Sequence, residues 1–68
     1  MTLEKAHELI AMHVQLGSGY NRNAVRMVLG EVMRDFGQEK VDELIRTYAL
    51  EQKWQIRPGT VFTSAFKQ

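Results

Sequence analysis

Hydrophobic residues recur along this chain at the three- and four-residue spacing that places side chains on one face of an α-helix. The clearest case is residues 21–36, where the apolar positions form one stripe at about 100° per residue. A β-strand would need apolar and polar residues to alternate, and this segment does not alternate. The pattern predicts a helix over residues 21–36, capped by Asn21, whose inner stripe is Val25, Val28, Leu29, Val32 and Phe36.

A helix is also predicted before this segment, over residues 3–16. The hydroxyl of Thr2 can accept a free N–H of the first turn, and Gly17 suits the left-handed position that ends many helices. The apolar positions of residues 3–16 cover more than half of the helix circumference, which is wider than the stripe of a typical surface helix. We therefore expect this helix to be covered on more than one side.

The third predicted helix spans residues 38–52 and follows the second after a single glycine, Gly37. A link this short favours a helical hairpin or an angled corner. If helical spacing continues through the end of this segment, Leu50 and Trp54 lie on the side opposite the inner stripe. That inner stripe consists of Val41, Leu44, Ile45 and Tyr48.

The remaining residues, 53–68, are expected to form a partly ordered tail. Pro58 pushes the preceding residue out of helical geometry, and Pro58-Gly59 favours a turn. A free tail is normally polar, whereas this one carries Val61, Phe62 and Phe66. We expect the tail to pack on the helices or on another chain. The predicted fold is thus one all-α domain over residues 1–68, with three helices and an apolar C-terminal tail.

Size and composition leave very good helix packing or self-association as the source of stability. A core in 68 residues contributes little net stability, and small domains usually add disulfides, a metal or a partner subunit. The chain has no cysteine, which excludes disulfides and thiolate metal sites. The net charge of +1 lacks the basic excess typical of nucleic-acid binding. No signal peptide or membrane span is indicated, so we expect a cytoplasmic protein with no membrane association.

Apolar side chains outnumber the positions that three helices need for packing against one another. Large exposed apolar patches usually mark interfaces. We therefore predict a non-enzymatic protein–protein interaction module that self-associates, most simply as a homodimer, and that can present a groove to another protein. The alternative is that the tail covers these residues within one chain. The predicted interface residues are Met12, Leu16, Met27, Gly30, Leu50, Trp54 and Phe62.

Candidate catalytic and metal-binding residues are few. His7 and His13 are six residues apart, so their imidazoles point to different sides of one helix and cannot share an ion there. His13 lies within the apolar arc and is expected in the core or an interface. Glu4 and Glu8 resemble a paired-carboxylate site but also fit a solvated face. Ser18 and Ser64 have no histidine and acid arranged as a triad. We predict no enzyme activity, no metal and no cofactor.

Binding of nucleic acid or of an anion is the remaining possibility. The segments around Gly37 could form a helix-turn-helix or winged-helix regulator of transcription, but the second helix would begin with Glu39, Asp42 and Glu43. Arg22 and Arg26 are one turn apart and could contact an acidic partner or an anion. The loop Gly17-Ser18-Gly19 precedes a helix but lacks the spacing of a phosphate-binding loop.

Overall fold

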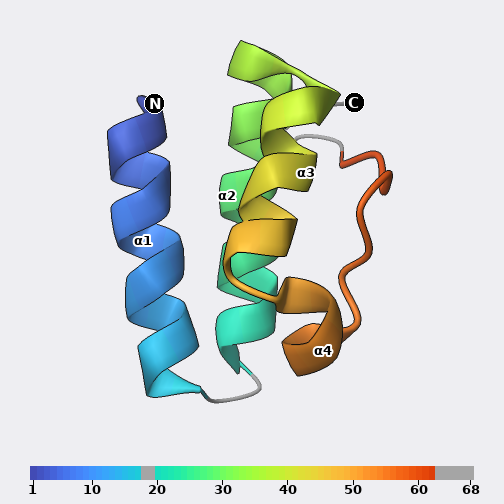
Figure 1. Cartoon of the computed structure of the whole chain (residues 1–68). Helices are drawn as coiled ribbons and strands as arrows, with labels where there is room; N and C mark the ends of the chain where they lie inside the picture. Colours follow the sequence, from blue (N-terminus) through green and yellow to red (C-terminus); the bar gives the residue numbers. More distant parts are fainter. Residues whose placement is uncertain (18–19, 63–68) are drawn as a thin grey trace.

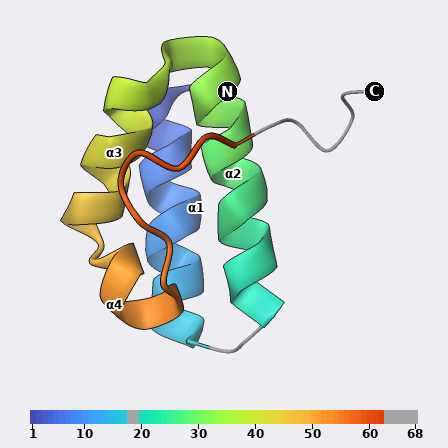
Figure 2. The ribbon, with the colours of Figure 1, turned by 90° about the vertical axis from the view of Figure 1, so that its right-hand side faces the viewer.

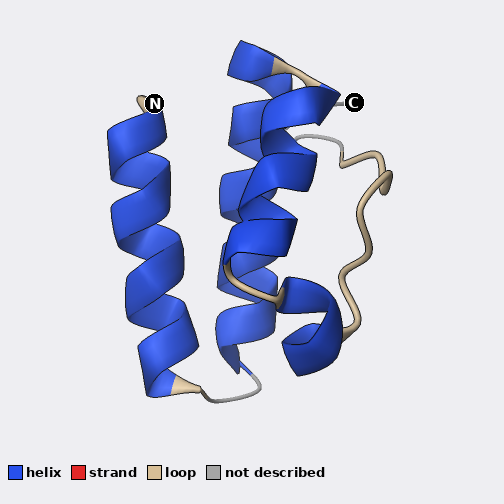
Figure 3. Ribbon diagram, in the orientation of Figure 1, coloured by secondary structure: helices blue, strands red, loops and turns tan. Residues whose placement is uncertain are grey.

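The computed structural model describes residues 1–17 and 20–62 as four helices and a final extended segment (Figures 1 and 3). The helices are α1 (Leu3–Leu16), α2 (Tyr20–Phe36), α3 (Gln38–Thr47) and α4 (Leu50–Trp54). The first three lie side by side along one direction, and the chain reverses between each and the next. The predicted all-α class is confirmed.

Helix α1 has the predicted bounds and ends. Thr2 accepts a hydrogen bond from the backbone N–H of Lys5 at 3.1 Å. At the other end Gly17 has φ 71° and donates its N–H to the carbonyl of His13. Only Ala6 and Ile10 are fully buried, and Leu3, Leu9 and Val14 pack partly against the core. The apolar arc of α1 is therefore wide, but only a narrow stripe within it is buried by the rest of the chain.

Helix α2 is the longest helix and supplies the largest share of the core. Val25, Leu29 and Val32 are completely buried and Val28 nearly so, which confirms most of the predicted stripe. Phe36, at the end of the stripe, is instead exposed. The helix begins at Tyr20, so Asn21 lies inside its first turn. The side chain of Asn21 binds His13 of α1.

Gly37 alone separates α2 from α3, and the two helices form the predicted hairpin. Gly37 has φ 95°, a conformation that residues with a side chain rarely adopt. Its N–H donates to the carbonyl of Met33 at 3.0 Å and ends α2. Helix α3 then buries Val41, Leu44 and Ile45 against the other helices. This glycine therefore sets the antiparallel pairing on which the fold depends.

The prediction of one helix over residues 38–52 is wrong, because the chain breaks at Tyr48 and Ala49. Ala49 has φ 53°, in the left-handed region. The break starts the short helix α4 in a new direction, and Leu50 becomes completely buried. Helical spacing alone had placed Leu50 opposite the inner stripe. One left-handed residue therefore moves Leu50 from the predicted surface into the core.

The segment after α4 packs against its own chain. Residues 55–62, which we call the strap, run back along α3 and α2 on the side away from α1 (Figure 2). Ile56 and Phe62 are buried in the same core cluster as the helices. Residues 63–68 of the predicted tail lie outside the described part of the chain. The hairpin of α2 and α3 is thus covered by α1 on one side and by the strap on the other.

Candidate interaction site

The seven predicted interface residues separate into exposed and buried groups. Met12, Leu16 and Met27 are 47%, 67% and 53% exposed. Met12 and Leu16 are one turn apart on α1, and Met27 is the exposed apolar residue in the middle of α2. We call these three residues the α1–α2 outer face.

The other predicted interface residues are covered by their own chain. Leu50 is completely buried and Phe62 is 7% exposed, so their assignment to an exposed interface is wrong for the single chain. Trp54 is half-buried, and Gly30 is buried. The strap and α4, which belong to the same chain, cover these residues. The sequence alone did not show whether the same chain or another chain would cover them. The free apolar surface is therefore smaller than predicted.

Gly30 lies on the side of α2 that carries the strap. It is four residues after Arg26 and three before Met33, which places all three on one stripe of the helix. The guanidinium of Arg26 lies 5.3 Å from the ring centre of Phe62, and the N–H of Phe62 points to the sulfur of Met33 at 3.4 Å. Gly30 was predicted as an interface residue, and its two neighbours on this stripe contact Phe62 of the strap.

The two arginines predicted to contact an anion have partners inside the molecule. Arg22 donates from Nε to the carbonyl of Trp54 at 3.1 Å, at the end of α4 where backbone carbonyls lack helical partners. Arg26 lies over the ring of Phe62. Both side chains therefore stabilise α4 and the strap, which disfavours the predicted contact with an anion or an acidic partner.

Gln38 and Asp42 bind the turn of the strap, and we call this pair the latch. The carboxylate of Asp42 accepts the N–H of Gly59 at 2.8 Å and Nε2 of Gln38 at 2.8 Å. Gln38 also donates to the carbonyl of Thr60 at 3.0 Å. The hydrogen bond from Gly59 holds the pKa of the Asp42 carboxyl below its ordinary value, and the hydrogen bond from Gln38 contributes a smaller lowering.

Acid is expected to weaken the latch. A carboxyl whose pKa falls on folding stabilises the folded state above its unfolded pKa, about 3.9, and this stabilisation is lost as the pH falls through the folded pKa. Urea unfolding near pH 7 and near pH 3 measures the loss. We expect Asp42→Asn to lose less stability over this range than the unmodified chain.

The control for this measurement is Glu39→Gln, which removes an equal charge from the exposed side of the same helix. Its acid dependence should match that of the unmodified chain. Equal acid dependence of Asp42→Asn and the unmodified chain would show that the latch does not require the charged carboxylate.

Both histidines connect α1 to other helices. Tyr48 donates its hydroxyl proton to the carbonyl of His7 at 3.3 Å, and Nδ1 of His7 lies 2.9 Å from the same hydroxyl. The side-chain amide of Asn21 donates to the carbonyl of His13, and its oxygen lies 3.3 Å from Nδ1 of His13. Each arrangement suits a ring that donates from Nδ1. These contacts give the histidines structural roles.

The other candidates for chemistry gain no support. Glu8 pairs with Lys5 at 3.3 Å on the exposed face of α1. The described residues contain no group of three or more His, Asp or Glu side chains that could hold a metal ion. Ser18, Ser64 and most of the loop Gly17-Ser18-Gly19 lie outside the described residues.

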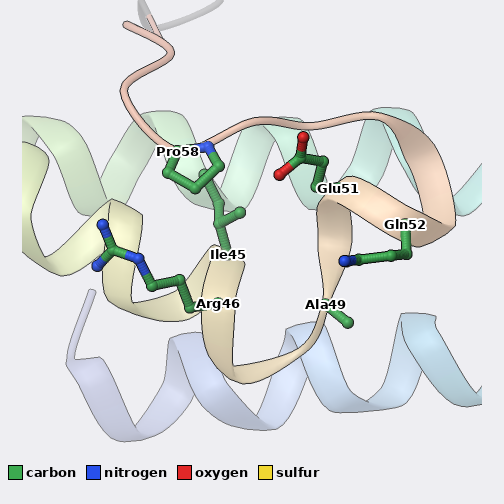
Figure 4. A pocket seen from close by; sticks show the side chains of 6 residues that line it. All are labelled: Ile45, Arg46, Ala49, Glu51, Gln52 and Pro58. Carbon is green, nitrogen blue, oxygen red and sulfur yellow. The ribbon is translucent and has the colours of Figure 1, made fainter.

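A shallow pocket lies where α3, α4 and the strap meet (Figure 4). Its volume of about 230 Å³ is below the roughly 300–1,000 Å³ of typical ligand pockets. The side chain of Glu51 at its rim pairs with Arg57 at 3.8 Å. The lining offers little enclosed apolar surface for a small molecule, and it consists of Ile45, Arg46, Ala49, Glu51, Gln52 and Pro58.

Comparison with known proteins supplies no relative. No family model matches the chain, and neither a curated protein nor a solved structure shows significant similarity to it. Across residues 1–17 and 20–62, no helix is both long and apolar enough to cross a membrane.

Proposed function

We propose that this protein is a non-enzymatic helical interaction module that pairs with a second copy through the α1–α2 outer face. The observation that carries the proposal is the exposure of Met12, Leu16 and Met27, each about half exposed or more. Met is enriched in protein interfaces, and its flexible thioether adapts to irregular partner surfaces.

Pairing through one shared face is the simplest form of association. A two-fold dimer brings the same surface of each copy together, so one apolar face covers another. Helices α1 and α2 are firmly joined through the core and the His13–Asn21 contact. Because the two helix backbones are held in place, only the side chains of the face lose conformational freedom on binding, which supports stable pairing.

DNA binding through α3 is less well supported. The first turns of α3 carry Glu39 and Glu43 on the exposed surface and the carboxylate of Asp42 in the latch. These negative charges would repel the phosphates beside a DNA groove. Arg22 and Arg26 lie on α2 and have partners in α4 and the strap.

Sedimentation equilibrium over a concentration series tests the proposed pairing. Met27→Lys puts a charge into the face and should weaken association at least about tenfold, equivalent to about 1.4 kcal/mol. Leu16→Lys should act in the same direction. Val61→Lys is the matched control, because Val61 is 71% exposed, lies outside the α1–α2 outer face and does not pack against the core.

An unmodified chain that remains monomeric at several hundred micromolar would contradict self-association. If Val61→Lys and Met27→Lys weakened association equally, the added positive charge would be the cause, and its position on the α1–α2 outer face would not matter.

A further inference from the structure

The strap is held by side chains of α2 and α3, which we call its seat. Its apolar anchors are Ile56 and Phe62, and both are buried in the core cluster. Between these anchors, the latch binds the N–H of Gly59 and the carbonyl of Thr60. Arg26 and Met33 contact Phe62 at the far end. The seat therefore recognises an extended segment with two apolar anchors on either side of a turn.

Each of these contacts joins the strap to a helix across space. The same contacts form whether the strap belongs to the same chain or to an identical neighbour. Exchange of an identical element between copies needs no new complementarity, because the element already fits. The question is which feature connects the strap to its own seat.

Gln55 is that connection. It ends α4 in the left-handed conformation at φ 60°, which is unfavourable for a residue with a side chain. Its N–H donates to the carbonyl of Glu51 at 2.8 Å, and the N–H of Ile56 donates to that of Leu50 at 3.3 Å. This turn directs the strap back along its own α3 and α2 (Figure 2).

We propose that two copies exchange their straps, so that residues 56–62 of each copy occupy the seat of the other. Gln55 is the hinge. In the exchanged form Gln55 adopts an extended conformation. Each copy then has one unfavourable left-handed residue fewer. The hydrogen bond from Ile56 to Leu50 passes to water, whereas the bond from Gln55 to Glu51 lies before the hinge and is kept, as are the seat contacts.

Strap exchange is independent of pairing through the α1–α2 outer face. The strap covers the hairpin on the side away from α1, whereas Met12 and Leu16 lie on α1. A copy that uses both contacts can bind two neighbours. The two modes together therefore allow assemblies larger than a dimer, and each is removed by different substitutions.

Hinge variants test the exchange in a Met27→Lys background, which suppresses the other mode. Gln55→Gly tolerates the left-handed conformation and should lower the association constant about tenfold relative to Met27→Lys alone. Gln55→Val disfavours that conformation and should raise it about tenfold. Sedimentation equilibrium measures both, and circular dichroism checks that each variant is helical.

Crosslinking identifies the chain that supplies the strap. The described residues include no cysteine, and the sequence has none elsewhere, so introduced thiols react alone. Chains carrying Gln38→Cys are mixed with chains carrying Thr60→Cys and treated with a short bis-maleimide. Strap exchange predicts a crosslinked pair of one chain of each kind, with a yield that rises when both carry Gln55→Val.

Two results would overturn strap exchange. One is an association constant that does not respond to either hinge variant. The other is a mixture that yields no crosslinked pair containing both kinds of chain, even at concentrations where the chains associate. If Gln55→Val does not fold, Gln55→Gly and the crosslinking experiment decide the question, since neither depends on it.

Discussion

Leu50→Ala is expected to destabilise the protein by about 3 kcal/mol, within the range of 2–5 kcal/mol for truncation of a buried leucine. Leu50 is completely buried and belongs to the core cluster. Removing its side chain loses buried apolar surface and leaves a cavity between α4 and the other helices. The measurement is urea unfolding followed by circular dichroism. Because the whole domain has only about 3–5 kcal/mol expected from its core, about 0–2 kcal/mol remains, and the variant should unfold at a much lower urea concentration than the unmodified chain.

Two controls separate this effect from a general sensitivity of the chain. Leu50→Met keeps the volume and should cost less than about 1.5 kcal/mol. Met27→Ala removes a large apolar side chain from a half-exposed site and should change stability by less than about 0.5 kcal/mol. If Leu50→Ala and Met27→Ala had equally small effects, Leu50 would lie on the surface, as one unbroken helix over residues 38–52 would place it.

The break that buries Leu50 shows where sequence periodicity was insufficient. The period of the apolar residues predicts α1 and most of α2 because these helices are regular. The residues at the break, Tyr48 and Ala49, include no glycine or proline. Alanine is a strong helix former, so local propensity favours a continuous helix there. Burial of Leu50 and Ile56 outweighs that preference and stabilises a left-handed alanine, which is a tertiary effect.

The strap was predicted in part. Two of its apolar residues, Val61 and Phe62, follow the Pro58-Gly59 turn, and they indicated that the tail packs on something. Phe62 is buried as expected, whereas Val61 is 71% exposed. In an extended segment neighbouring side chains point to opposite sides, so only one of the two can face the helices. The sequence did not show that the same chain provides the packing surface.

The contacts of the candidate site were the least predictable feature. The sequence assigned no binding role to Gln38, and Asp42 was noted only as one of the acidic residues at the start of the third predicted helix. Their spacing of four residues places both side chains on one face, which was a usable signal for a shared partner. The partner itself is the backbone at Gly59, 17 residues after Asp42. Pairing over such a separation depends on the path of the strap, which no local pattern specifies.

Phe62→Ala is expected to cost about 3 kcal/mol, since truncation of buried phenylalanine usually costs about 3–5 kcal/mol and Phe62 keeps 7% of its surface exposed. The loss includes the cation–π contact with Arg26, worth about 0.5–1 kcal/mol at an exposed site.

A double-mutant cycle over Arg26→Ala and Phe62→Ala isolates the contact between the two side chains, because the coupling remains after the separate losses are subtracted. We expect a coupling of about 0.5 kcal/mol or more from urea unfolding. Val61→Ala provides the neighbouring control and should change stability by less than about 0.5 kcal/mol, since Val61 faces solvent. If Phe62→Ala were as mild as Val61→Ala, the strap would not be part of the core. The seat on α2 and α3 would then be open to solvent, and strap exchange would lose its physical basis while pairing through the α1–α2 outer face would not.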